Sequence, residues 1–67
     1  MKQGDLVRCT YRDLIYNTRR GGRCIGAVDE GDVVLVLDEL ATGHKVQILH
    51  PVYGSGFVTR YYFELVG

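Results

Sequence analysis

Apolar and polar residues alternate over several short stretches of the chain, and this period of two is typical of β-strands. No stretch keeps a 3.6-residue period for three turns, and β-branched and aromatic residues dominate the apolar positions. The pattern predicts strands over residues 6–11, 32–39, 44–50, 57–59 and 63–66. The segment between the first two strands is expected to form a long bent hairpin with its tip near residues 19–22, because Gly21 and Gly22 permit a turn.

Turn-forming residues separate the predicted strands. The segment 40–43 supplies one turn, and Pro51 ends the third strand because it cannot donate a hydrogen bond to a ladder. A further turn is predicted at Gly54, Ser55 and Gly56, and residues 60–62 fit a single 3-10 turn. Five short, closely spaced strands predict an all-β fold, a small barrel or sandwich, forming one domain over residues 1–67.

The alternation also predicts which side chains face the core. On the first strand the inward positions are expected to be Val7, Cys9 and Tyr11. Leu6 then points outward, although polar residues are usual on an outer face.

Residues 31–66 carry a resemblance to a known family. The run Gly31-Asp32-Val33-Val34-Leu35-Val36-Leu37 resembles one strand of SH3 domains, and Gly56 to Val66 is similar to their closing strand, 3-10 turn and last strand. The resemblance implies a single five-stranded SH3-like small barrel with a long first (RT-type) loop and a 3-10 turn before the last strand. It also implies that Val34 and Val36 point into the barrel, so that Val33 and Leu35 point outward. Either the long loop covers these two residues or they form a contact patch for another chain. The chain as a whole is also similar to small SH3-like proteins of bacteriophages, which implies a host or virion protein as partner.

The peptide groove of SH3 domains is only partly matched. The groove's tryptophan should fall near His44 and Lys45, but the chain contains no tryptophan, and Thr59 stands at the position of the groove's proline. Only Tyr62 and Tyr11 stand where the resemblance implies groove tyrosines. Binding of proline-rich peptides, which needs an aromatic-lined groove, is therefore not the expected function.

Composition limits what so short a chain can do. The hydrophobic share of 46% and the charged share of 24% are ordinary for a folded domain. A core of this size supplies roughly 3–5 kcal/mol of net stability, which leaves little room for a deep pocket. No apolar run approaches the ~20 residues that span a bilayer, so a soluble protein without a membrane partner is expected. The resemblance to bacteriophage proteins implies that it lies in the host cytoplasm or on the virion.

Candidate chemistry is sparse. The two cysteines, Cys9 and Cys24, match no zinc spacing and are expected to be buried free thiols. His44 and His50 have no nucleophile or paired ligands beside them in the sequence. Neither a metal, a cofactor nor an enzymatic activity is therefore expected.

Charge is distributed unevenly although the net charge is zero. Residues 1–28 hold six Lys or Arg against two Asp or Glu, and residues 29–67 hold the reverse. This asymmetry indicates charged partners, or self-association in which the acidic part of one copy meets the arginine-rich loop of another.

Two surfaces are candidates for binding another protein: the outward residues Leu6, Val33 and Leu35, and the loop with Arg19, Arg20 and Arg23. The sequence therefore predicts a small non-enzymatic protein-binding or structural module. One alternative is a nucleic-acid-binding barrel, in which the same arginines contact phosphates and Tyr11 and Tyr16 stack on bases. The other alternative is an oligomeric component of a larger assembly.

Overall fold

The computed structural model describes residues 1–39 and 44–66, and the turn predicted at 40–43 lies outside them. The described part of the chain is all-β, with seven strands and a 3-10 turn. The strands are β1 (Leu6–Cys9), β2 (Asp13–Thr18), β3 (Gly21–Val28), β4 (Val33–Glu39), β5 (Lys45–His50), β6 (Gly54–Thr59) and β7 (Phe63–Leu65). The 3-10 turn, η1 (Arg60–Tyr62), lies where the sequence predicts it.

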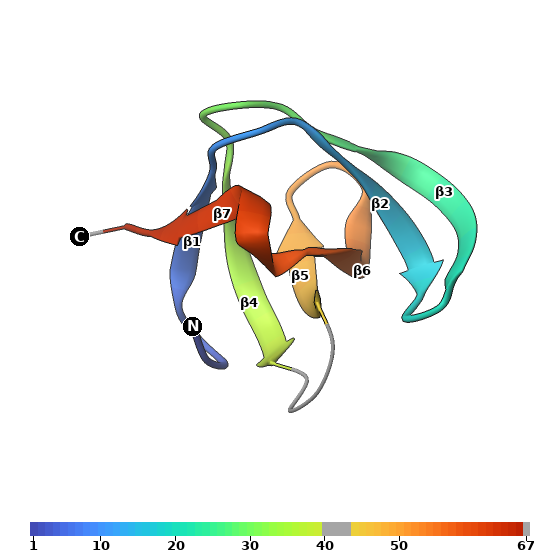
Figure 1. Ribbon diagram of the computed structural model, residues 1–67, viewed down its shortest axis with the longest axis horizontal. Coiled ribbons are helices and arrows are strands. Elements are labelled where there is room, and N and C mark those ends of the chain that lie inside the picture. The colour runs from blue at the N-terminus through green and yellow to red at the C-terminus, as the bar shows by residue number, and fades with distance from the viewer. Residues whose placement is uncertain (40–43, 67) are drawn as a thin grey trace.

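All strand pairs are antiparallel, and they form an open sheet in the order β3-β2-β6-β5-β4-β1-β7. Strands β3 and β7 are its two edges. The hairpin β2–β3 curves away on the side opposite β1 and β7 (Figure 1). A single pair, Tyr16 with Phe57, joins this hairpin to the rest of the sheet through β6.

The core is built mainly from β-branched side chains on the inner face of the sheet. These residues interlock on a pleated surface because their branched Cβ atoms fill the space between neighbouring strands. The buried apolar residues are Val7, Cys9, Ile15, Val28, Val34, Val36, Val46, Ile48, Val58 and Phe63. Every strand contributes at least one of them, so the hairpin β2–β3 shares the core of the other strands.

Gly56 lets the hairpin approach the sheet closely. A Cβ atom at this position would overlap the Cγ2 atom of Ile15 and lie 2.9 Å from the carbonyl oxygen of Tyr16. The Asp13 carboxylate reinforces the approach, because its Oδ2 accepts a hydrogen bond from the backbone N–H of Thr59 at 2.7 Å. These contacts fix the beginning of β2 and its middle against β6.

Two expectations about the strands are wrong. The predicted count of five omits β2 and β3. The hairpin expected at these residues consists of two paired strands with two register shifts, although Asn17, Arg23 and glycines interrupt the apolar pattern. Tyr11 does not face the core: β1 ends at Cys9, the chain bends, and Tyr11 is 67% exposed. The alternation that predicts it to be buried stops with the strand.

The turn predicted at residues 54–56 is also misplaced. The observed turn comprises residues 51–53, and Gly54, with φ of 83°, is the first residue of β6. Gly56 lies inside the strand, where its missing side chain serves packing rather than a turn. Within the described residues, no helix could cross a membrane.

Candidate functional site

A row of leucines crosses the outer face of three neighbouring strands. Leu6 on β1 lies opposite Leu35 on β4, and Leu35 lies opposite Leu49 on β5. Residues directly opposite in an antiparallel pair share one face of the sheet, with Cβ atoms about 5 Å apart. Leu6 and Leu49 are 51% and 43% exposed, and Leu35 between them is half-buried. We call these three residues the leucine row.

Two valines extend the apolar area around the leucine row. Val66 donates its backbone N–H to the carbonyl of Leu6, which places it beside the row, and Val33 lies two residues before Leu35 on the same face. Both valines are partly exposed, as the sequence predicts for Val33. The polar boundary on the β7 side is an exposed ion pair, with Arg8 Nη1 3.4 Å from Glu64 Oε1. An apolar patch with a charged rim is typical of a protein-binding surface.

The three arginines of the predicted loop lie at the tip of the hairpin β2–β3. Arg19 and Arg20 form the turn between the strands, and Arg23 follows on β3. All three are exposed, and none makes an ion pair within the described residues. They form the arginine tip, which offers three free guanidinium groups for phosphate or carboxylate oxygens.

The two tyrosines of the nucleic-acid alternative lie in different places relative to the arginine tip. The Lys45 ammonium lies 5.5 Å from the ring centre of the half-buried Tyr16, so a cation already occupies a face of this ring. Tyr11 precedes β2, whereas Arg19 follows it, so the six residues of β2, spanning about 20 Å, separate the two side chains. The structure therefore separates Tyr11 from the arginine tip, whereas Tyr16 lies opposite Cys24, the neighbour of Arg23 on β3.

Tyr11 instead meets Tyr62, the tyrosine with which the resemblance groups it. Their ring centres are 5.3 Å apart at a tilt of 44°, and both rings are exposed. A second aromatic pair, not expected from the sequence, joins His44, just before β5, to Tyr61 of the same 3-10 turn, with Nδ1 and the hydroxyl oxygen 3.1 Å apart. Tyr61 and Tyr62 of η1 thus each contact one further ring.

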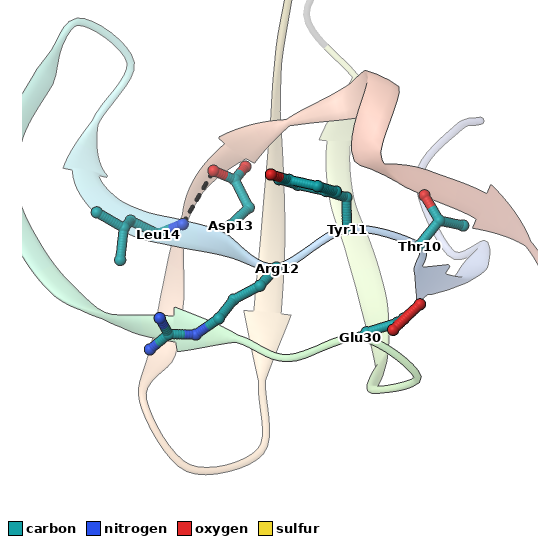
Figure 2. A pocket seen from close by; sticks show the side chains of 6 residues that line it. All are labelled: Thr10, Tyr11, Arg12, Asp13, Leu14 and Glu30. Atoms are coloured by element: carbon teal, nitrogen blue, oxygen red, sulfur yellow. Dashed lines mark hydrogen bonds between the residues drawn. The ribbon is translucent and has the colours of Figure 1, made fainter.

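An open hollow of about 570 Å³ lies beside Tyr11. Figure 2 shows the Tyr11 ring and the Asp13 carboxylate on one side of the chain, with the Arg12 side chain on the other. Both Asp13 oxygens already accept backbone hydrogen bonds, from Leu14 and from Thr59. Glu30 makes no ion pair within the part of the chain that the structure describes, so its carboxylate and the tyrosine face are suited to a cationic group.

His50 is the buried polar side chain among the described residues. Its Nδ1 accepts hydrogen bonds from the backbone N–H groups of Val52 (3.1 Å) and Tyr53 (3.3 Å), so the neutral ring carries its proton on Nε2. Nε2 lies 3.8 Å from Asp32 Oδ2, and the ring packs on Tyr53 at 4.8 Å between centres. His50 therefore organises the turn at 51–53.

The two cysteines have different environments. Cys9 is buried, as expected, and burial raises the pKa of its thiol above the ordinary value. The expectation that Cys24 is buried is wrong: it lies exposed on β3, which is an edge strand and so is covered on fewer sides than β1. No three metal-ligating side chains gather within residues 1–39 and 44–66.

Thiol titration checks this difference. With Ellman's reagent at about pH 8, near the ordinary thiol pKa, we expect Cys24 to react in the folded protein and Cys9 to react only on unfolding. The raised pKa of Cys9 leaves less thiolate at any given pH, and burial excludes the reagent as well. Cys24→Ser should remove the fast reaction, and equal rates for both thiols in the native protein would contradict the structure.

The residues that the sequence does not single out are Leu49 and Tyr61. Leu49 follows an ordinary alternation, and only the register of β4 with β5 places it beside Leu35. Comparison with known proteins finds no matching family model, no matching curated protein and no matching solved structure.

Proposed function

We propose that the chain is an SH3-like barrel that binds another protein through the leucine row. Strand adjacency supports the SH3-like part: β7-β1-β4-β5-β6 form a continuous five-stranded set, with η1 directly before β7. In this interpretation the hairpin β2–β3 is the long RT-type loop between the first and second strands of the five. The phage origin and a host or virion partner remain what the resemblance implies.

The exposed leucine row is the observation that supports a binding function. A single large apolar side chain exposed on the outer face of a sheet is common in folded proteins and needs no partner. An adjacent set across three strands forms an apolar patch, which favours burial against a partner. Burying a leucine side chain contributes about 1.5–3 kcal/mol. The half-buried Leu35 at the centre and the more exposed Leu6 and Leu49 beside it match an interface whose central residue is already positioned by its neighbours.

Charge substitutions in the leucine row test this function. We expect Leu6→Glu or Leu49→Glu to abolish capture of the partner from a lysate, because each places a carboxylate within the apolar contact area. The measurement is a pull-down with the immobilised chain. NMR then maps which backbone amides of the chain shift when the captured partner is bound. Retained capture by both variants would contradict the proposed surface.

Val52→Glu is the matched control. Val52, like Leu6 and Leu49, is an exposed apolar residue, at 77%, but it belongs to the turn at 51–53 rather than to the leucine row. It should leave capture unchanged, which separates loss of a specific surface from a general effect of added negative charge. Thermal unfolding of each variant verifies that the fold is retained.

A further inference from the structure

The hairpin β2–β3 leaves one edge of the sheet open along β3. Within the described residues β3 pairs with β2 and with no other strand. Its residues Gly22, Arg23 and Cys24 are exposed. Such an edge is a site at which another chain can align.

The two ends of this open edge carry opposite charge. The arginine tip lies at the beginning of β3, and Asp29 and Glu30 follow directly after its end. Asp29 pairs with Arg12 at 3.0 Å, but both side chains are largely exposed, and Glu30 makes no ion pair within residues 1–39 and 44–66. We call Asp29 and Glu30 the acidic end. The eight residues of β3, about 27 Å, separate the acidic end from the arginine tip.

We propose that two copies of this chain associate side by side along β3, antiparallel and related by a two-fold axis. The arrangement places each arginine tip against the acidic end of the other copy. A two-fold axis at Cys24 brings Arg19 beside Asp29 of the other copy, and an axis at Ile25 brings Arg20 beside Glu30 of the other copy. Both registers use the charge complementarity twice, once at each end of the interface.

The symmetry decides between a closed dimer and a filament. Opposite charges at separate places on a molecule favour head-to-tail contact, which forms rings or open filaments. Here the opposite charges lie at the two ends of one strand, so an antiparallel pair satisfies both and leaves neither for a third copy. The expected product is therefore a dimer and nothing larger.

Irregularities in β3 limit the backbone contribution to this dimer. The register of β3 against β2 shifts on both sides of Cys24, and bulges of this kind hinder a continuous ladder between edges. Gly26 to Val28 is the regular stretch, opposite residues 13–15. Charge contacts then supply much of the association, so the dimer should weaken as salt screens exposed charges.

Sedimentation of the full chain over a range of concentrations tests the proposal. We expect a monomer–dimer equilibrium at about 20 mM salt that shifts towards monomer at about 500 mM, where the screening length falls to a few ångströms. A monomer at every concentration in low salt would overturn the proposal, and so would species larger than a dimer.

Charge reversal tests the pairing of the two ends. Arg19→Glu with Arg20→Glu makes the arginine tip negative, and Asp29→Lys with Glu30→Lys makes the acidic end positive. Each double variant alone should dimerise about tenfold more weakly or not at all, because the two ends of β3 then carry like charge and repel each other across the interface. An equimolar mixture of the two should restore a dimer containing one of each. Failure of the mixture to associate would overturn the proposal, as would equal weakening by Lys2→Glu, an exposed lysine remote from β3.

Cys24 provides an independent readout at the middle of the interface. Because Cys9 is buried, a short bismaleimide should join two copies through Cys24, in a yield that falls with added salt and in the tip variant. A yield that depends on neither would contradict edge pairing. Leu49→Glu should change none of these results, so failure of the dimer and failure of the proposed function are distinguishable.

Discussion

Gly56→Ala is expected to lower the free energy of unfolding by about 2–3 kcal/mol, a large part of the roughly 3–5 kcal/mol available to a domain of this size. The added Cβ would overlap the Ile15 side chain and approach the Tyr16 carbonyl oxygen, and a backbone oxygen in a strand cannot rotate away. The hairpin β2–β3 would have to move off β6, which weakens the single pair between Tyr16 and Phe57. In thermal unfolding followed by circular dichroism, the loss corresponds to roughly 10 °C or more in Tm.

Ser55→Ala is the control for this substitution. Ser55 is the exposed neighbour of Gly56 on β6, and its replacement should change stability by less than about 0.5 kcal/mol. Equal stability of Gly56→Ala and the native protein would mean that β2 does not approach β6 as the structure places it. Hydrogen exchange locates the destabilisation in Gly56→Ala: the amides of β2 and β3 should lose protection before those of β4 and β5.

His50→Phe is expected to cost about 1–3 kcal/mol, although phenylalanine is more apolar and similar in size. Phenylalanine can keep the ring contact with Tyr53, but it offers no acceptor to the backbone N–H groups of Val52 and Tyr53. The turn at residues 51–53 would then lose the group that organises it. Urea denaturation measures the cost, and exchange rates of these two amides locate it.

His50→Asn separates the lost acceptor from lost packing. The asparagine side-chain oxygen lies near the position of Nδ1, so the two amides should keep their protection while the contact with Tyr53 is lost. We therefore expect fast amide exchange in His50→Phe and slower exchange in His50→Asn. Unchanged exchange in the phenylalanine variant would show that the imidazole does not hold the turn.

Local patterns in the sequence were sufficient to predict the all-β class and the positions of several elements. The prediction of an all-β chain, of η1 at 60–62 and of the hairpin with its tip near 19–22 is confirmed. Val34 and Val36, which the resemblance to SH3 domains places inward, are also buried. These features depend on neighbours within a few residues, which the sequence displays directly.

Features that depend on where the backbone bends were not predictable in the same way. Tyr11 continues the period of β1 in sequence, but the chain leaves the strand after Cys9 and the tyrosine meets Tyr62 instead. Gly56 resembles a turn residue until the approach of Ile15 on β2 gives it a packing role. Cys24 looks like a small core residue, and only the sheet order reveals that its strand is an edge.

The candidate surfaces were predicted as residues but not as arrangements. Leu6 is outward by alternation and Leu35 by the resemblance to SH3 domains. Leu49 joins them only through the register of β5, and the extent of the row follows from that pairing. The arginine tip was expected, but its distance from Tyr11 depends on the length of β2. Charge asymmetry along the chain suggested association, and the position of the opposite charges at the two ends of β3 is the basis for the proposed closed pair.

β1 pairs with β4 on one side and with β7 on the other, so the first strand in the sequence depends on the last. Cys9 meets Phe63 only after nearly the entire intervening chain has closed into a loop, and loop closure costs entropy before the contact stabilises anything. We therefore expect folding on the slow scale of non-local β-proteins, in milliseconds to seconds. A nascent chain still lacking β7 would keep one side of β1 unpaired, so the sheet is completed only when its shortest strand emerges.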